Sequence, residues 1–233
     1  MNGFSHDSTV DHPLPQHTIE PRPGTWSPAR FAEWDWAQLR PLPTLQRADG
    51  YGAVQFPTEV RVCADASALY TCFDCQDNHI WGTLTGRNAP IYTEEVVEIF
   101  IAPGTATPQI YYEFELSPNG TLLDLRIDSP NGNRQGIHVD SKWDCGQVEW
   151  AAQRDDDNNH WRGLLVLPWR SICEADEVPT AWRANFYRIE RPANAEPEFS
   201  SWSPTLTNPP DFHRPARFGT LHFQPEMGDT STA

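Results

Sequence analysis

A nearly continuous apolar run near the middle of the chain limits what this sequence can fold into. Residues 94–104 read EEVVEIFIAPG and end at a Pro-Gly pair, which stops regular structure. Successive side chains of an extended strand point to opposite faces, so this run has two largely apolar faces. One face carries Val97, Ile99 and Ile101, and the other carries Val96, Glu98 and Phe100. Such a strand is typical of a sheet that is covered on both sides.

Alternating segments on both sides of this run predict further strands joined by tight turns. Residues 110–128 read IYYEFELSPNGTLLDLRID, in which two alternating runs flank the turn SPNG, a hairpin pattern. Residues 58–77 predict a second hairpin, and residues 147–168 predict a third with an acidic, amide-rich turn. Residues 181–190 and 218–223 complete a set of about ten strands.

This pattern predicts an all-β fold, a single antiparallel β-sandwich with short helical turns near residues 31–39 and 168–172. The 22 prolines favour many turns over long helices. No repeat or change of composition divides the 233 residues, so we expect one domain. It should span residues 25–225, after a polar, proline-rich tail or surface strap at residues 1–24 and before a short tail at residues 226–233.

Composition argues against several classes of partner. The formal net charge of -15 comes without a cluster of Lys and Arg, so we expect no nucleic-acid binding. No apolar run is long enough for a spanning helix, so we expect no membrane attachment. The N-terminus lacks a basic start followed by an apolar stretch, so no secretory signal is visible and the sequence alone favours the cytoplasm. Five scattered cysteines, an odd number, fit a reducing compartment better than a disulfide scaffold.

Two short motifs resemble metal sites, and for both we favour a structural interpretation. Cys72 and Cys75 have the spacing of a zinc or redox pair, but strand residues three apart point to opposite faces, and no second pair completes a site. Residues 155–160, DDDNNH, resemble the start of a calcium loop. An EF-hand loop needs Gly at its sixth position and Glu at its twelfth, where this chain has His160 and Val166. We expect a solvated hairpin turn, with Ca²⁺ as a structural ion left as the alternative.

Three glutamates on the predicted strands are candidates for function. Glu98 lies on the most apolar strand, and a carboxylate buried there needs a partner or a shifted pKa. An ion pair with Arg188 would make Glu98 structural, whereas a place at the floor of a ligand cleft would make it functional. Glu113 and Glu115 share one face of a strand at a spacing of about 7 Å, which is comparable to the carboxyl separation in inverting glycosidases.

The sequence nevertheless favours a binding module over an enzyme. A catalytic pair must flank the scissile bond from both sides, which neighbours on one strand do poorly. The chain also contains no G-x-S-x-G, H-E-x-x-H, P-loop or dinucleotide motif. Two alternatives stay open: a xylanase-like glycoside hydrolase that uses Glu98, Glu113 or Glu115 as acid and base, and a structural β-sandwich that binds a protein partner.

Several segments, in order, resemble carbohydrate-binding module family nine. They are TEVRVCADASALYTCF, EEVVEIFIAP, ANFYRIE and SSWSPT followed by DFHRPARFGTLHF, and the resemblance spans residues 36–223. It implies a DOMON-like β-sandwich, and a non-catalytic domain of xylanases and related proteins that grips the ends of sugar chains such as xylan. The implied partner is a carbohydrate or another small polar ligand, with no cofactor. Haem, which some domains of this fold hold through a methionine, is not favoured because Met1 and Met227 lie in the predicted tails.

The resemblance also implies a set of ligand contacts. Two rings sandwich one sugar in the family, and their positions fall at Tyr92 and Phe212, where the family usually has tryptophan. Glu98 matches a carboxylate that accepts hydrogen bonds from sugar hydroxyls. Tyr187 occupies a position where the family often has an amide, and Glu113 occupies the position of an arginine.

The loop PPDFHRPARFG, residues 209–219, would then present one wall of the sugar slot. Its three prolines should stiffen it, so the order of the loop need not depend on burying Phe212. We expect Phe212 at the surface of this loop. Phe218, next to a glycine at the start of the last strand, should instead pack into the core.

Overall fold

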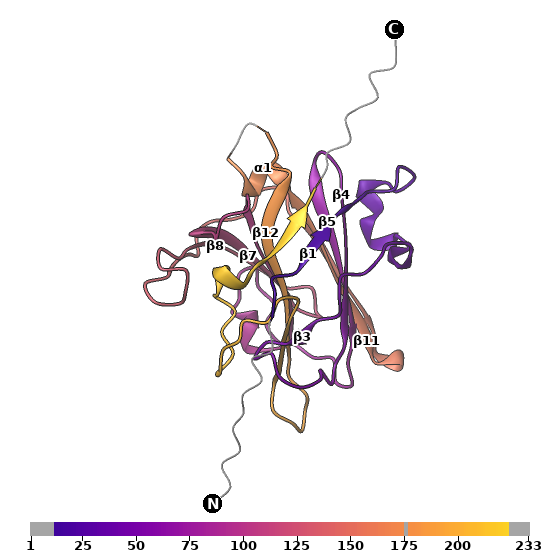
Figure 1. The fold of residues 1–233 in the computed structure, drawn as a ribbon. Helices are drawn as coiled ribbons and strands as arrows, with labels where there is room; N and C mark the ends of the chain where they lie inside the picture. The colour runs from indigo at the N-terminus through magenta and orange to yellow at the C-terminus, as the bar shows by residue number, and fades with distance from the viewer. Residues whose placement is uncertain (1–11, 175–176, 224–233) are drawn as a thin grey trace, which may run out of the picture.

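The chain folds into two β-sheets that pack face to face in a computed structural model, which describes residues 12–174 and 177–223 (Figure 1). These residues form fourteen strands, and their single α-helix is the four-residue α1 (Trp169–Ile172). The predicted all-β sandwich with short helical turns is therefore confirmed. The predicted tail at residues 226–233 lies outside the described residues, as do Met1 and Met227.

The first sheet has nine strands in the order β1-β14-β12-β6-β7-β8-β9, with β13 beside β12 and β3 beside β13. Strands β1 and β14 run parallel, and the other neighbours run antiparallel. The strand bounds are β1 Gln16–Thr18, β3 Gln46–Arg47, β6 Val96–Pro103, β7 Ile110–Leu116, β8 Leu122–Asp128, β9 His138–Asp140, β12 Ala181–Glu190, β13 Glu198–Ser201 and β14 Gly219–His222.

The second sheet has five strands in the order β10-β11-β5-β4-β2. Its strand bounds are β2 Glu20–Pro21, β4 Thr58–Ala64, β5 Ala68–Gln76, β10 Glu149–Asp155 and β11 His160–Pro168. The three predicted hairpins are confirmed, because β4 pairs with β5, β7 with β8, and β10 with β11. In Figure 1, β7, β8 and β12 lie on the left, and β4, β5 and β11 lie on the right.

The main hydrophobic core lies between the two sheets. Val97, Ile99 and Ile101 of β6 face it, as predicted, together with Phe73 of β5 and Phe186 of β12. The two phenylalanine rings meet edge to face with their centroids 6.0 Å apart. The other face of β6, which carries Glu98, points away from this core and can contribute to a site outside the sandwich.

The predicted tail or strap at residues 1–24 is described from His12 onward, and this part is built into both sheets. Strand β1 pairs with β14 of the first sheet, and β2 pairs with β4 of the second. His17 and Ile19 are buried. The segment therefore connects the two layers rather than only lying on their surface.

Each sheet also carries an apolar layer on its outer face. On the second sheet, the 3-10 turns η1 (Pro28–Glu33) and η2 (Trp36–Gln38) cover strand residues, and the Trp34 ring lies 5.0 Å from the Tyr70 ring. On the first sheet, Phe100 packs against Tyr187 and Phe218. Phe218 is fully buried, which confirms its predicted place in the core.

The ion pair with Arg188, one of the two alternatives for Glu98, does not form, because the two side chains lie on opposite faces of the first sheet. The Arg188 guanidinium points between the sheets, 3.0 Å from Asp77 and 3.0 Å from Glu95, and it also pairs with Glu190. Neighbouring residues of a strand alternate between faces, so the register of β12 with β6 places Tyr187, and not Arg188, beside Glu98.

The two metal-like motifs have the predicted local structure, a strand and a hairpin turn. Cys72 and Cys75 point to opposite faces of β5, one into the outer layer and the other into the main core. All five cysteines are buried free thiols, and burial raises the pKa of Cys75 to about 12. Residues 155–160 include a hairpin turn, η4 (Asp156–Asn158), in which Asp155 accepts a hydrogen bond from the Asn158 N–H.

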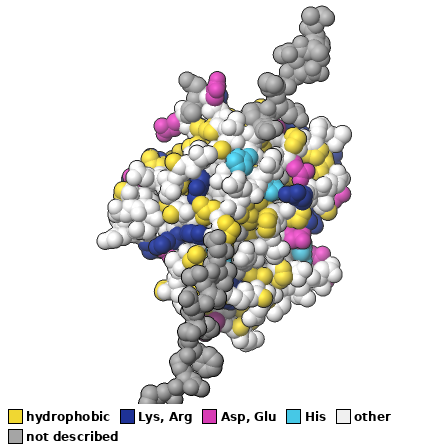
Figure 2. Space-filling view, viewed as in Figure 1, with side chains coloured by type: hydrophobic (Ala, Val, Ile, Leu, Met, Phe, Trp, Pro, Cys, Tyr) yellow, Lys and Arg dark blue, Asp and Glu magenta, His cyan; other side chains and the backbone are white. Residues whose placement is uncertain are grey.

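The surface in Figure 2 carries Lys and Arg side chains in separate small groups among acidic and apolar ones. Within residues 12–174 and 177–223, no helix is both long enough and apolar enough to cross a lipid bilayer.

Candidate functional site

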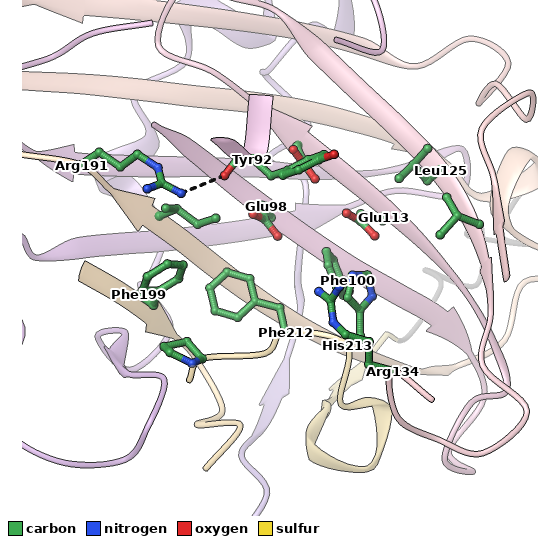
Figure 3. Close-up of a pocket in the computed structure, with 14 residues that line it drawn as sticks. Tyr92, Glu98, Phe100, Glu113, Leu125, Arg134, Arg191, Phe199, Phe212 and His213 are labelled. Carbon is green, nitrogen blue, oxygen red and sulfur yellow. Dashed lines mark hydrogen bonds between the residues drawn. The ribbon is translucent and has the colours of Figure 1, made fainter. Parts of the chain in front are cut away.

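A pocket of about 370 Å³ lies on the outer face of the first sheet. Sites for small molecules commonly have volumes of about 300–1,000 Å³. Four of the five predicted contact residues line it, namely Tyr92, Glu98, Glu113 and Phe212. In Figure 3, the Glu98 carboxyl lies between the ring of Tyr92 and the ring of Phe212, and the Glu113 carboxyl lies to its right, above Phe100 and His213.

Three buried glutamates form the polar part of the pocket floor. Glu98 on β6 is in register with Glu115 on β7, and Glu113 lies two residues before Glu115 on the same face of β7. Oxygen atoms of the three carboxyls all lie within 4.8 Å of one another. Glu113 is the most exposed of the three, at 4%. Among the described residues, each glutamate has one buried oxygen without a hydrogen-bond partner.

Burial and mutual repulsion favour protonated carboxyls on this floor. Burial, and then the charge of Glu113, raises the pKa of Glu98 well above its ordinary value of 4.5. Burial, and then the charges of Glu98 and Glu113, raises the pKa of Glu115 in the same way. A cation within the pocket would reverse this preference, because a nearby opposite charge favours the ionised form.

Tyr92 provides the open wall of the pocket. It lies on the 3-10 turn η3 (Ile91–Thr93), directly before β6, and its side chain is 48% exposed. The backbone of the turn is held by Arg191, which donates hydrogen bonds to the backbone oxygens of Tyr92 and Glu94. The ring is therefore accessible to a ligand, whereas its backbone is fixed.

Phe212 provides the opposite wall, but the prediction that its ring lies on the loop surface is wrong. The side chain is only 7% exposed and belongs to the same apolar cluster as Phe218. Its ring stacks on Tyr187 with centroids 4.2 Å apart, and it meets Phe199 edge to face. The loop lies across the outer face of the first sheet, so one face of the ring is covered by protein while the residue still lines the pocket.

Tyr187 does not line the pocket. It is fully buried, and its hydroxyl donates a hydrogen bond to the Phe212 backbone oxygen at 3.1 Å. Burial raises the pKa of Tyr187 well above its ordinary value, so this hydroxyl stays a donor. The structure thus places Tyr187 behind the Phe212 wall, where it supports the loop instead of facing the cavity.

Three basic lining residues were not among the predicted contacts. His213 follows Phe212, and its Nδ1 lies 2.8 Å from the Tyr111 hydroxyl; burial lowers the pKa of this imidazole. Arg134 and Arg191 come from segments distant in sequence, and Arg134 pairs with Asp211 at 3.0 Å. The sequence offered a signal only for His213, through its position beside a predicted wall residue.

Two groups of acidic side chains are close enough for their oxygens to share one cation. One consists of the three pocket glutamates, and the other consists of Asp77, Glu95 and Glu190. The second group already surrounds the Arg188 guanidinium. Of these two groups in the described part of the chain, the pocket glutamates are therefore the one that is not already occupied by an arginine.

A family model described as carbohydrate-binding family 9 matches residues 49–223. The chain belongs to carbohydrate-binding family 9. This result confirms the family resemblance seen in the sequence. The match includes Tyr92, Glu98, Glu113, Tyr187 and Phe212, so every predicted contact lies inside the family 9 region.

Individual relatives of this family 9 chain are distant. A protein of Arthroderma benhamiae described as "Extracellular protein" is 25% identical over 181 residues, which cover 72% of this chain and 79% of that protein. A structure from Bacteroides uniformis, solved as a candidate carbohydrate-binding protein, has a TM-score of 0.72 at 21% identity and covers 91% of this chain and 100% of its own.

Solved family 9 modules share the same fold. A module of Caldicellulosiruptor kristjanssonii in complex with cellotriose has a TM-score of 0.57 at 13% identity, with 94% of this chain and 98% of that chain covered. A structure of a family 9 module from the same organism in complex with glucose has a TM-score of 0.55 at 13% identity. It covers 94% of this chain and 100% of its own. At this identity the likeness concerns the fold and not the ligand contacts.

Proposed function

We propose that this chain is a non-catalytic sugar-binding domain that holds one sugar unit between Tyr92 and Phe212. The observation that carries the proposal is a single pocket lined by both rings and by buried glutamates. One sugar or the end of a sugar chain suits a cavity of about 370 Å³ better than a long internal stretch of polysaccharide.

The chemistry of the pocket matches a pyranose ring. Aromatic faces bury the apolar C–H patches of a sugar, and a carboxyl group can hydrogen-bond a sugar hydroxyl whether it is protonated or ionised. Glu98, Glu113 and Glu115 all line the pocket, and each has one carboxyl oxygen without a hydrogen-bond partner among the described residues. The two aromatic rings would therefore stack on the sugar ring, and the glutamates would orient it through hydrogen bonds.

Support for the ligand class comes from membership of family 9 and from the solved modules described with glucose and cellotriose. These relatives favour a neutral sugar or oligosaccharide as the first probe. Two features of the pocket should set its preference among sugars: the small rings of Tyr92 and Phe212, and the acidic floor.

The arrangement favours binding over glycoside hydrolysis. The carboxyl groups of a glycosidase flank the scissile bond, about 5–5.5 Å apart in retaining enzymes and about 6.5–9.5 Å apart in inverting ones. Here the three carboxyls share one floor, with oxygens within 4.8 Å of one another. A bond held above them would have acids on one side only.

Calorimetric titration of the full chain tests the proposal. The panel should contain glucose, cellobiose, cellotriose, xylobiose and glucosamine, and at least one should bind with a Kd between ~10 μM and ~1 mM, about -4 to -7 kcal/mol. Reducing ends measured in the same samples after incubation should not increase. Flat heats across the whole panel, with folded protein, would remove the proposal.

A further inference from the structure

The floor of the pocket holds three acidic groups without a basic partner. Within residues 12–174 and 177–223, no Lys, Arg or His side chain forms an ion pair with Glu98, Glu113 or Glu115. Each of these side chains is at least nine-tenths buried, and each has a carboxyl oxygen that no described group bonds. Buried acids are stable either in the protonated form or beside a positive group, so a cation is the partner that would allow this floor to ionise.

The rest of the molecule shows how this chain neutralises such a group when it uses its own side chains. Asp77, Glu95 and Glu190 form a second set of three buried acids of the same size, and the Arg188 guanidinium contacts all three. All three acids of that set are buried, and none of them lines the sugar pocket. The pocket set differs because it opens to a cavity instead of enclosing an arginine.

The two arginines that line the pocket are already engaged. Arg134 donates to Asp211 at 3.0 Å, and Arg191 donates to the backbone oxygens of Glu94 and Tyr92 at 3.0 Å and 3.3 Å. These contacts hold them at the walls. His213, the third basic lining residue, faces the Tyr111 hydroxyl, and burial lowers its pKa, so we expect the positive group to come from the ligand.

The walls suit a cation that is attached to a sugar. Tyr92, Phe100 and Phe212 all line the pocket, and aromatic faces attract ammonium groups as well as apolar C–H patches. A protonated primary amine offers three N–H donors, one for each of the three carboxyl groups that line the floor. A bare metal ion would use the carboxyls but would gain nothing from aromatic walls, and Ca²⁺ prefers six to eight oxygen ligands.

We propose that the pocket selects an amino sugar whose amine is free and protonated, such as a glucosamine unit, with its ammonium on Glu98, Glu113 and Glu115 and its ring between Tyr92 and Phe212. This inference rests on the proposed sugar-binding function and specifies its ligand class. The N-acetylated form of the same sugar lacks the charge and should be a poor ligand.

Calorimetry at pH 7 with three matched sugars tests the inference on the wild-type chain. Glucosamine should bind at least about tenfold more tightly than glucose or N-acetylglucosamine, a difference of about 1.4 kcal/mol. Equal or tighter binding of glucose would overturn the amino-sugar inference and leave the proposed function standing. If none of the three sugars and none of the neutral oligosaccharides gave binding heat, both the amino-sugar inference and the proposed function would be wrong.

A matched pair of variants locates the preference on the floor. Glu113→Gln keeps the shape of the side chain and removes one charge, so the preference for glucosamine over glucose should fall roughly tenfold. Glu59→Gln changes a half-exposed glutamate that does not line the pocket, and it should leave the preference unchanged. An unchanged preference in Glu113→Gln, with a wild-type circular dichroism spectrum, would contradict the inference.

Titration with CaCl₂ alone separates the amine from a metal. Addition of Ca²⁺ should produce no saturable heat that Glu113→Gln abolishes. A saturable Ca²⁺ isotherm that depends on Glu113, together with no preference for glucosamine, would assign the floor to a metal ion and overturn the inference.

Discussion

The ring of Phe212 stacks on the ring of Tyr187 with centroids 4.2 Å apart and planes inclined by 16°. The Tyr187 hydroxyl also donates a hydrogen bond to the Phe212 backbone oxygen at 3.1 Å. Strand β12 therefore holds the wall residue of the pocket twice, once through its ring and once through its backbone. The position of this wall follows from a buried side chain of the sheet and not only from the prolines of the loop.

Tyr187→Phe should weaken both the fold and the wall. The ring stack stays, but the Phe212 carbonyl loses its buried donor, which costs about 1–3 kcal/mol. Urea unfolding should show a lower midpoint with an unchanged slope. Tyr51→Phe is the matched control, because Tyr51 is 72% exposed, and it should leave the midpoint unchanged. Equal midpoints for the two variants would mean that the hydroxyl does not hold the loop.

Phe212→Ala should destabilise the protein and also impair binding. Truncation of a buried Phe costs about 3–5 kcal/mol, and Phe212 should fall at the lower end because its side borders an open pocket. Phe218→Ala, in a fully buried position, should fall at the upper end. Thermal unfolding ranks the two variants. If Phe212→Ala unfolded at the same temperature as wild type, this would contradict the burial of the Phe212 ring against Tyr187.

Tyr92→Ala should affect binding with little change in stability. Tyr92 is 48% exposed, and its backbone contact with Arg191 does not require the side chain. Surface substitutions usually change stability by about 0.5 kcal/mol or less, whereas loss of a stacking wall should weaken sugar binding about tenfold. Tyr51→Ala removes an exposed ring that does not line the pocket and should bind like wild type. Matching affinities for the two variants would exclude Tyr92 from the sugar site.

Stability should depend on pH through the floor. The folded-state pKa of Glu98 lies above its ordinary value of 4.5, so folding favours the protonated form. This contribution is complete below about pH 4.5 and declines as the pH rises toward the folded pKa, by about 1.4 kcal/mol per pH unit for each such group. Glu115 acts in the same direction.

Glu98→Gln removes one of these groups. As the pH rises, the unfolding free energy of the variant should therefore increase relative to that of wild type. Urea unfolding of both proteins between pH 5 and pH 8 measures the difference. Glu59→Gln, in a half-exposed position, should run parallel to wild type. Parallel curves for Glu98→Gln and wild type would show that Glu98 does not hold its proton in the folded chain.

Local patterns in the sequence were enough to predict the strands that position the site. The alternation of β6 and β7 put Glu98, Glu113 and Glu115 on defined faces, and the structure has the same faces. Period-two alternation is a local property, so it can be read without knowing which strands are neighbours.

Pairings between distant segments could not be read in this way. Strand β1 pairs with β14 from the other end of the chain, and β2, β3, β9 and β13 are too short for a period to be visible. The same limit explains two of the three differences between expectation and structure at the site. The neighbour of Glu98 is set by the register of β6 with β12, and the burial of Phe212 is set by a ring on β12.

The most direct test of the account is to map the bound sugar by NMR on the ¹⁵N-labelled full chain. During titration with glucosamine, and separately with glucose, the largest amide shift changes should fall at Tyr92, Glu98, Glu113 and Phe212, the residues that line the pocket. They should follow the same saturation curve as the calorimetric heats. Saturable shift changes that leave these four residues unaffected and gather elsewhere, for example in the acidic turn at residues 155–160, would contradict the account.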